Sequence, residues 1–127
     1  MHRSRLTSAL FDVPDAVYRD VATFWSGALG TSTSDSDEPD YIEFDDLTGG
    51  LRFMVQRTGN DTPARVHLDI ETDDVEAEVA RLERLGATRV EKVKTWWVMR
   101  DPAGLVFCVV RVQTPEEFES HATTWED

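Results

Sequence analysis

The sequence predicts an α+β fold made of two βαβββ modules that form a curved, cup-shaped mixed sheet with the helices on its outer face. Two observations carry this prediction. The order strand, helix and then two or three strands occurs twice, and residues 49–55 (GGLRFMV) align with residues 103–109 (AGLVFCV). One sheet and one helix cannot bury their apolar faces alone, so two modules should combine.

The first half begins with a loosely alternating strand and continues with an amphipathic helix. The helix carries Val17, Val21, Phe24 and Ala28 at steps of three and four, and Gly30 follows as its C-cap. The expected elements are a strand at 5–12, a helix at 15–29, a loop or poorly formed edge strand at 31–40, and strands at 41–45 and 51–57 separated by the LTGG sequence of 47–50.

The second half repeats this order. The stretch RVHLDIET alternates apolar and polar residues, as a strand with one buried face does. Asp73 or Asp74 can cap the next helix, which Gly86 ends. The expected elements are a strand at 65–72, a helix up to residue 85, strands at 88–93, 95–100 and 105–112, and a tail at 114–127 that forms a short helix or a frayed acidic end.

Length and composition predict a single globular domain over residues 1–127, because 40% of the residues are hydrophobic and the chain is too short for two ordinary domains. Module one covers about residues 4–58, module two about 64–112, and the C-terminal tail covers 113–127. A half-domain of about 60 residues is seldom stable alone, so we expect the modules to depend on each other.

The charge balance narrows the choice of partners. Lys and Arg number 13 and Asp and Glu number 25, a net charge of −12 that repels phosphate backbones and anionic lipid surfaces. We therefore expect neither nucleic acid nor membrane as a partner. Cys108 is the single cysteine and cannot form an internal disulfide, and the sequence has no leader-like or spanning apolar run. These features favour a cytoplasmic location.

Three segments resemble a known family. They are FWSGALG (24–30), HLDIETDDVEAEVARLERLGA (67–87) and WWVMRDPAGLVFCVV (96–110). The chain resembles, from about residue 6 to 112, the vicinal oxygen chelate superfamily, also called the glyoxalase, bleomycin-resistance and extradiol dioxygenase fold. It looks most like the glyoxalase-like subgroup of small single-domain proteins. Members share a shape but include isomerases, dioxygenases, thiol transferases and metal-free binding proteins.

The resemblance also implies where a metal would bind. Its metal-using members place four ligands inside the cup, and the matching positions here are Ser8, Met54, His67 and Cys108. Only His67 is an imidazole or carboxylate, and the other three suit Zn, Ni or Fe poorly. We therefore expect no catalytic metal and no cofactor; a divalent metal is disfavoured, and a soft Cu(I)-type site at Met54, His67 and Cys108 even more so.

Strand alternation extends the set of inward-facing residues, while Phe53, Leu68 and Phe107 should turn to the helices. Arg52 can pair with a carboxylate or phosphate of a ligand, or it can form a salt bridge to an acidic residue of the same cup, namely Asp12, Asp69 or Glu71. The further inward positions are Leu10, Asp12, Gln56, Asp69, Glu71, Val106 and Val110.

Two tryptophans, the three histidines and Cys108 are further candidates. Trp96 and Trp97 must face opposite sides, so one ring, assigned here to Trp97, can stack on a flat ligand or simply pack. His67 is a general acid or base oriented by Asp69 or Glu71, or a relic bound to Ser8 or solvent. Apolar neighbours favour an inert Cys108 thiol. His2 and His121 lie on expected tails without identified partners.

The leading hypothesis is a metal-free, homodimeric protein that binds a small organic ligand in the cup. The second is an enzyme, a lyase or isomerase of the glyoxalase or epimerase type, with His67 as its acid–base residue or sole retained metal ligand. The third is a dimerisation or partner-binding domain without a ligand. The expected ligand-binding residues are Ser8, Arg52, Met54, Gln56, His67, Asp69, Trp97 and Cys108.

Overall fold

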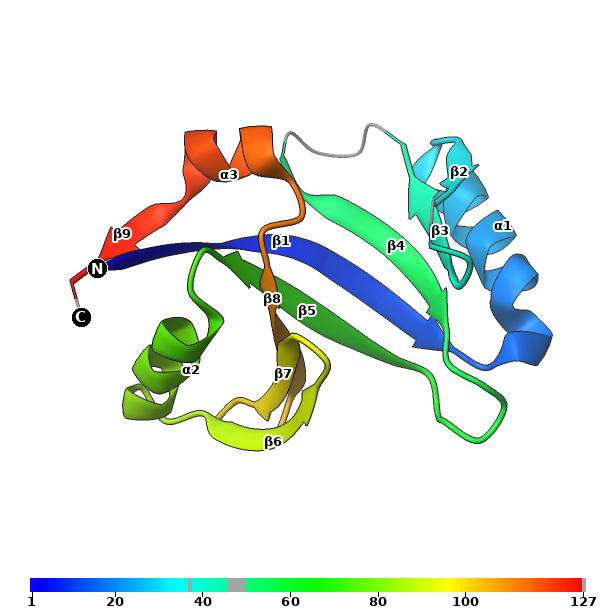
Figure 1. The fold of residues 1–127 in the computed structure, drawn as a ribbon. Coiled ribbons are helices and arrows are strands. Elements are labelled where there is room, and N and C mark those ends of the chain that lie inside the picture. The colour runs from blue at the N-terminus through cyan, green and yellow to red at the C-terminus, as the bar shows by residue number, and fades with distance from the viewer. Residues whose placement is uncertain (37, 46–49, 127) are drawn as a thin grey trace. The chain divides into compact units, whose positions relative to one another are not determined.

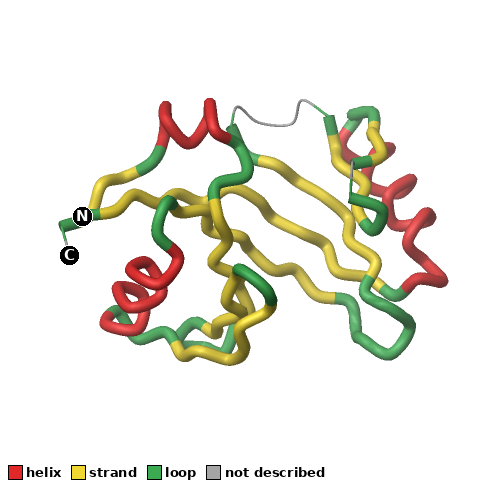
Figure 2. Tube along the Cα trace, in the orientation of Figure 1, coloured by secondary structure: helices red, strands yellow, loops and turns green. Residues whose placement is uncertain are grey.

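The computed structural model describes residues 1–36, 38–45 and 50–126. The chain divides into two compact units. We call Ser8–His67 the module-one unit, and Met1–Thr7 together with Leu68–Asp127 the module-two unit. The described residues form nine strands and three α-helices (Figures 1 and 2). Strands β1 (His2–Val13) and β5 (Arg65–Thr72) each contribute residues to both units.

The module-one unit is built on the second half of β1. This strand pairs in parallel with β4, β4 pairs antiparallel with β3, and β3 pairs antiparallel with β2. The helices precede these outer strands in the chain. The elements are η1 (Asp15–Val17), α1 (Tyr18–Leu29), β2 (Thr33–Asp35), β3 (Tyr41–Phe44) and β4 (Arg52–Arg57).

Helix α1 covers one face of the module-one strands. It begins at Tyr18, three residues later than the sequence predicts, because Asp15–Val17 form a 3₁₀ turn after Pro14. It ends at Gly30, whose φ of 70° is the left-handed conformation that glycine adopts most easily. The apolar core between helix and strands contains Val13, Tyr18, Ala22, Ile42, Phe44 and Val55.

The module-two unit repeats the pattern. Here β5 pairs in parallel with β8, β8 pairs antiparallel with β7, and β7 pairs antiparallel with β6. Asp74 caps α2 by accepting a hydrogen bond from the Ala77 amide at 3.1 Å, as predicted. The helix packs on β6, β7 and β8 over a core of Val79, Met99 and Val109 (Figure 1). The elements are α2 (Val75–Arg84), β6 (Thr88–Val93), β7 (Trp96–Arg100) and β8 (Val106–Arg111).

The chain ends of the module-two unit are ordered into the fold. Helix α3 (Pro115–His121) buries Phe118, and β9 (Thr123–Trp125) pairs antiparallel with the start of β1. The tail therefore contains a short helix, which was one of the two predicted alternatives. The strand that follows it was not predicted.

His2 corrects a prediction. It is not on a tail without partners but 2% exposed in β1, and its Nε2 lies 2.7 Å from the Glu78 carboxylate of α2. His121 does lie near the end, 3.3 Å from Glu117 in α3. The strand begins earlier than predicted because these contacts with α2 and β9, made by residues far away in the chain, leave no trace in the local pattern.

The predicted α+β class with mixed strand pairings is confirmed. The first three residues of the LTGG sequence, 47–49, lie outside the described residues, and so does Gly49 of the internal alignment. A cup shared by the two modules stays a prediction. None of the described helices is long and apolar enough to cross a membrane.

Candidate functional site

The candidate site is the sheet face of the module-one unit that is turned away from α1. In the pairing of β1 with β4, Ser8 lies opposite Arg52, Leu10 opposite Met54, and Asp12 opposite Gln56. Opposed residues of paired strands share a face, so the predicted alternation holds within this unit. We call this set the polar face; its members on β1, β3, β4 and β5 are Ser8, Leu10, Asp12, Tyr41, Glu43, Arg52, Met54, Gln56 and, through its contact with Asp12, His67.

A carboxylate and an imidazole meet on this face. The Nδ1 atom of His67 lies 2.6 Å from Oδ2 of Asp12, and both side chains are buried. The Arg65 Nε atom donates to the same oxygen at 3.2 Å. An acidic partner on Nδ1 holds the ring in one orientation. This pair therefore has the composition of a general acid–base unit.

Asp12 was not predicted as a partner of His67, yet it contacts the ring. The Glu71 carboxylate instead accepts hydrogen bonds from Thr114 and Gln113. The predicted role of Asp69 in orienting the ring stays a prediction. The sequence did place Asp12 on the inward face, but the contact joins residues 55 positions apart. Strand alternation says which face a residue occupies and nothing of which residue lies beside it on a distant strand.

Two buried polar atoms of the polar face lack a partner. Ser8 Oγ and Asp12 Oδ1 have no hydrogen-bond partner among residues 1–36, 38–45 and 50–126. Ser8 and Asp12 are 0% and 1% exposed. A buried polar atom without a hydrogen bond costs about 1–3 kcal/mol, so such atoms are expected where a ligand or a water molecule supplies the bond.

Arg52 is already paired, although not with the predicted residues. Its Nε donates to Glu43 Oε1 at 3.1 Å, instead of binding Asp12, Asp69 or Glu71. Both side chains stay about a quarter to a third exposed, and an ion pair in such a setting contributes only about 0–1 kcal/mol. A carboxylate or phosphate of a ligand can therefore compete with Glu43 for the guanidinium.

The rest of the polar face is part polar and part apolar. Gln56 donates from Nε2 to the Tyr41 hydroxyl at 2.9 Å. Leu10 and Met54 lie opposite each other and are 1% and 4% exposed. They place two buried apolar side chains between the Ser8 end of the strands and the Asp12 end.

The other predicted inward residues belong to the module-two unit. Asp69 and Cys108 lie directly opposite each other in the pairing of β5 with β8. Cys108 is partly buried and Asp69 is 8% exposed. Val109 and Phe107 belong to the α2 core, so Asp69 and Cys108 occupy the strand face turned away from that helix, as predicted.

Glu71 lies on the same face and holds the C-terminal segment by hydrogen bonds. Both of its carboxylate oxygens accept the Thr114 hydroxyl, at 2.6 and 3.0 Å, and one also accepts the Gln113 and Thr114 amides. Burial acts to raise the pKa of Glu71, but the hydrogen bonds from Thr114 and Thr7 outweigh it and hold the pKa below its usual value. Glu71 therefore anchors the start of the C-terminal segment.

The prediction that Trp97 faces the ligand is wrong. Its Nε1 donates to Glu76 of α2 at 3.1 Å, and its ring packs on the apolar core beneath that helix. Trp97 lies opposite Val109, which is fully buried in the same core. By alternation Trp96 takes the other face. The sequence did predict an acidic first turn for this helix, and Glu76 of that turn is the residue that accepts the Trp97 N–H.

The side chains of the polar face can be compared with the ligands that divalent metals prefer. On the polar face Glu43 binds Arg52, and Asp12 and His67 contact each other through one atom each, while Asp12 Oδ1 has no partner among the described residues. Ser8 and Met54 are poor ligands for Zn or Mn. Apart from Glu43, the polar face by itself therefore offers fewer side chains of the preferred kind than the three that catalytic zinc sites use.

Comparison with known proteins identifies the family. The family described as "Glyoxalase-like domain" matches residues 8–110, most of the chain. The chain belongs to this family, and the resemblance to the glyoxalase, bleomycin-resistance and extradiol dioxygenase superfamily is confirmed. No curated protein matches the sequence significantly.

Solved structures share the fold at low sequence identity. A protein titled NAD-dependent benzaldehyde dehydrogenase from Legionella pneumophila is 14% identical, with a TM-score of 0.60 over 84% of this chain and 98% of that one. Methylmalonyl-CoA epimerase from Mycobacterium tuberculosis is 12% identical, with a TM-score of 0.57 over 87% and 89%. The Mn(II)-bound glyoxalase from Novosphingobium aromaticivorans is 16% identical, with a TM-score of 0.57 over 89% and 43%. The three titles describe different proteins, so the shared fold leaves the chemistry open.

Proposed function

We propose that this glyoxalase-like protein binds a small organic ligand on the polar face, without a catalytic metal. The observation that carries this proposal is the pair of buried atoms, Ser8 Oγ and Asp12 Oδ1, without a partner among the described residues. Asp12 Oδ1 calls for a hydrogen-bond donor, because an ionised carboxylate only accepts. A ligand that donates a hydrogen bond to Asp12 Oδ1 would remove the free-energy cost of a buried oxygen without a hydrogen bond.

The neighbouring residues define the class of ligand. Leu10 and Met54 suit an aromatic or branched apolar body, and Arg52 suits an anionic group that displaces Glu43. A small aromatic or aliphatic carboxylic acid with a hydroxyl or amino group combines these properties. Asp69 and Cys108 from the module-two unit are proposed as further ligand-binding residues, as the sequence predicts.

A thermal-shift screen with small aromatic and carboxylate ligands tests the proposal. We expect hydroxy or amino carboxylic acids to raise the melting temperature, and Ser8→Ala and Arg52→Ala to abolish or reduce the rise. Arg57→Ala is the matched control, because Arg57 is also on β4 and paired to a carboxylate, Asp40, but lies over the Tyr18 ring on the α1 side. Absence of any ligand-dependent shift across a broad set would overturn the binding role.

A second candidate is an enzyme, and the 2.6 Å contact between Asp12 and His67 favours it. A lyase or isomerase of the glyoxalase or epimerase type needs a base that removes a proton from carbon next to a carbonyl, and a carboxylate-supported imidazole suits that step. We expect ligands found in the screen to exchange this proton with deuterium from solvent. His67→Gln should slow the exchange by about 10²-fold or more. Unchanged exchange in His67→Gln rejects this role.

Metal analysis separates the metal-free proposal from its alternative. We expect no stoichiometric Zn, Ni, Mn or Fe in protein purified without chelators. A stoichiometric metal that is lost in His67→Ala contradicts the metal-free proposal.

We further propose a cytoplasmic homodimer that binds neither nucleic acid nor membrane, consistent with the net charge of −12. The mass measured by light scattering tests the dimer. A dimer that fails to bind any ligand in the screen would support the remaining alternative, a dimerisation or partner-binding domain.

A further inference from the structure

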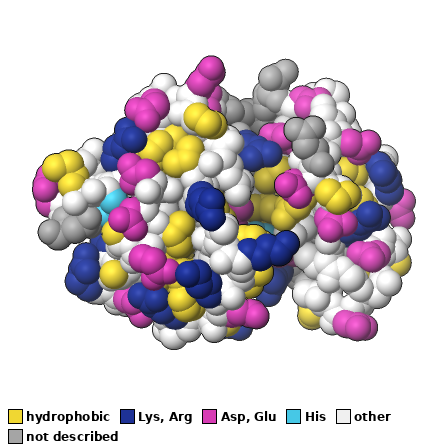
Figure 3. Space-filling model, in the orientation of Figure 1, with side chains coloured by type: hydrophobic (Ala, Val, Ile, Leu, Met, Phe, Trp, Pro, Cys, Tyr) yellow, Lys and Arg dark blue, Asp and Glu magenta, His cyan; other side chains and the backbone are white. Residues whose placement is uncertain are grey.

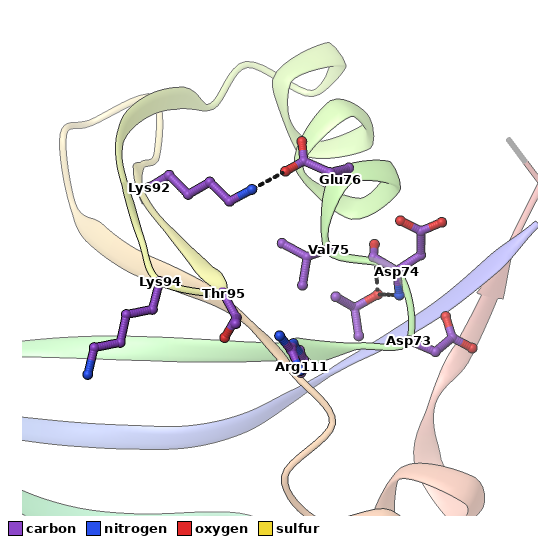
Figure 4. A pocket seen from close by; sticks show the side chains of 9 residues that line it. Asp73, Asp74, Val75, Glu76, Lys92, Lys94, Thr95 and Arg111 are labelled. Carbon is purple, nitrogen blue, oxygen red and sulfur yellow. Dashed lines mark hydrogen bonds and ion pairs between the residues drawn. The ribbon is translucent and has the colours of Figure 1, made fainter.

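A pocket of about 380 Å³ lies in the module-two unit and has no residue in common with the polar face. It forms where β5 ends and α2 begins, beside the turn between β6 and β7 and the end of β8 (Figure 4). Its volume falls within the range of small-ligand sites. The residues that matter for the argument are its charged side chains and Thr95.

Each carboxylate of this pocket already has a partner. Asp73 accepts the amide and Nε of Arg3 at 2.8 and 3.0 Å, and Asp74 accepts the Ala77 amide at 3.1 Å. Glu76 accepts Lys92 at 3.4 Å and Trp97 at 3.1 Å. Burial acts to raise the pKa of Asp73, but the Arg3 contacts hold it below its usual value, and the pKa of Glu76 is lowered chiefly by the Trp97 hydrogen bond.

Two cations of the pocket are different. Within residues 1–36, 38–45 and 50–126, neither Lys94 nor Arg111 makes a hydrogen bond or an ion pair with a carboxylate. In Figure 4 Lys92 reaches toward Glu76, whereas Lys94 and Arg111 do not. Carboxylates outnumber cations 25 to 13 in this chain, and Figure 3 shows the two kinds interspersed over the visible face. Among the described residues Arg84 and Arg100 also have no carboxylate partner, but Lys94 and Arg111 are the two such cations that line one pocket, where an anion can attract both charges.

Lys94 also occupies a backbone position that does not favour lysine. Its φ of 52° is in the left-handed region, and it is the one non-glycine residue there in the described part of the chain. Glycine or asparagine would form such a turn between β6 and β7 with less strain. The turn thus carries a lysine where the backbone would prefer another residue; Lys94 lines the pocket, and in Figure 4 its side chain extends away from Arg111.

We propose that this pocket binds the phosphate group of a small soluble phosphate monoester. Arg111 offers two parallel N–H donors, Lys94 a mobile point charge, and Thr95 a hydroxyl. Donors from separate strands and turns suit the three terminal oxygens of a phosphate better than the two of a carboxylate. The net charge of −12 favours a soluble phosphate over the headgroup of an anionic lipid surface.

The test is a titration of the full chain with inorganic phosphate at a constant ionic strength set with NaCl. Amide NMR chemical shifts report the binding. We expect saturable shifts at residues 75–76, 94–95 and 111, and only weak, unsaturated shifts with acetate. Arg111→Gln should weaken binding about tenfold or more. Lys94→Gly should also weaken binding while its melting temperature equals or exceeds that of the unmodified protein, since glycine relaxes the turn.

Matched controls make the result decisive. Arg84→Gln removes the same charge from the last turn of α2, and we expect it to leave phosphate affinity unchanged. Arg111→Lys keeps the charge but not the paired donors, so an intermediate affinity is expected, and circular dichroism verifies the fold of each variant. Non-saturable shifts, acetate binding as tight as phosphate, equal weakening in Arg84→Gln, or sedimentation with phosphatidic acid vesicles would each overturn the proposal.

Discussion

Two buried carboxylates at comparable places in the two units have opposite surroundings. Asp12 of the module-one unit holds His67 and Arg65 with one oxygen, while its other oxygen has no partner among the described residues. Glu71 of the module-two unit uses both oxygens, for the Thr114 hydroxyl and two amides. The chain satisfies both oxygens of Glu71 with its own C-terminal segment, whereas Asp12 Oδ1 is the atom for which we propose a ligand, so Glu71 is a structural acid and Asp12 a candidate functional one.

The largest effect is expected at Glu71. Glu71→Ala should lower the free energy of unfolding by about 3–5 kcal/mol, because Arg5, Thr114 and the Gln113 amide lose a buried acceptor. Urea unfolding measures the change. Glu116→Ala, an exposed acid of α3, is the control and should stay within about 0.5 kcal/mol. A Glu71→Ala protein as stable as this control contradicts the anchoring role.

Asp12→Ala should lower stability less, by about 1–3 kcal/mol. The exposed Arg65 side chain can return to water, and only His67 loses a buried partner. The same variant should abolish ligand-dependent thermal shifts, which Glu71→Ala should preserve when it is measured below its own melting temperature. Retained ligand response in Asp12→Ala would remove the distinction between the two acids.

The pH dependence of unfolding separates the acids further. The pKa of Glu71 is lowered from 4.5 in the folded state, so its contribution is fully present above pH 4.5 and is lost as the pH falls through the lower folded value. The stability of the unmodified protein should therefore drop below pH 4.5. Glu71→Gln should be less stable at neutral pH and show a shallower drop; parallel curves for both proteins would contradict this assignment.

The smallest effect is expected at Ser8. Ser8→Ala removes a buried hydroxyl without a partner, so stability should stay the same or rise by up to about 1 kcal/mol. Ligand affinity should fall at the same time. Thr7→Ala is the neighbouring control, since Thr7 bonds Arg5 and Glu71, and it should lose stability. A Ser8→Ala protein that is clearly less stable would mean that the hydroxyl has a partner within the fold.

Local sequence patterns predicted the elements and the faces well. Gly30 ends α1 and Asp74 caps α2, because left-handed φ angles and short side-chain acceptors are properties of single residues. Period-two alternation placed Ser8, Arg52, Met54 and Gln56 on one face. The start of β1 at His2 and the strand β9 were missed, because both depend on pairing with distant parts of the chain.

The sequence alone determined the family, the repeated order of elements and which residues share a strand face. Only the tertiary structure decided that Asp12 binds His67, that Arg52 binds Glu43 and that Trp97 turns to α2. The physical reason is that backbone periodicity depends on neighbours in sequence, whereas the ends of long side chains find their partners through strand register and packing. The same holds for the charges. The sequence supplies the net charge of −12, but only the fold decides that Lys94 and Arg111 have no carboxylate partner within the described residues.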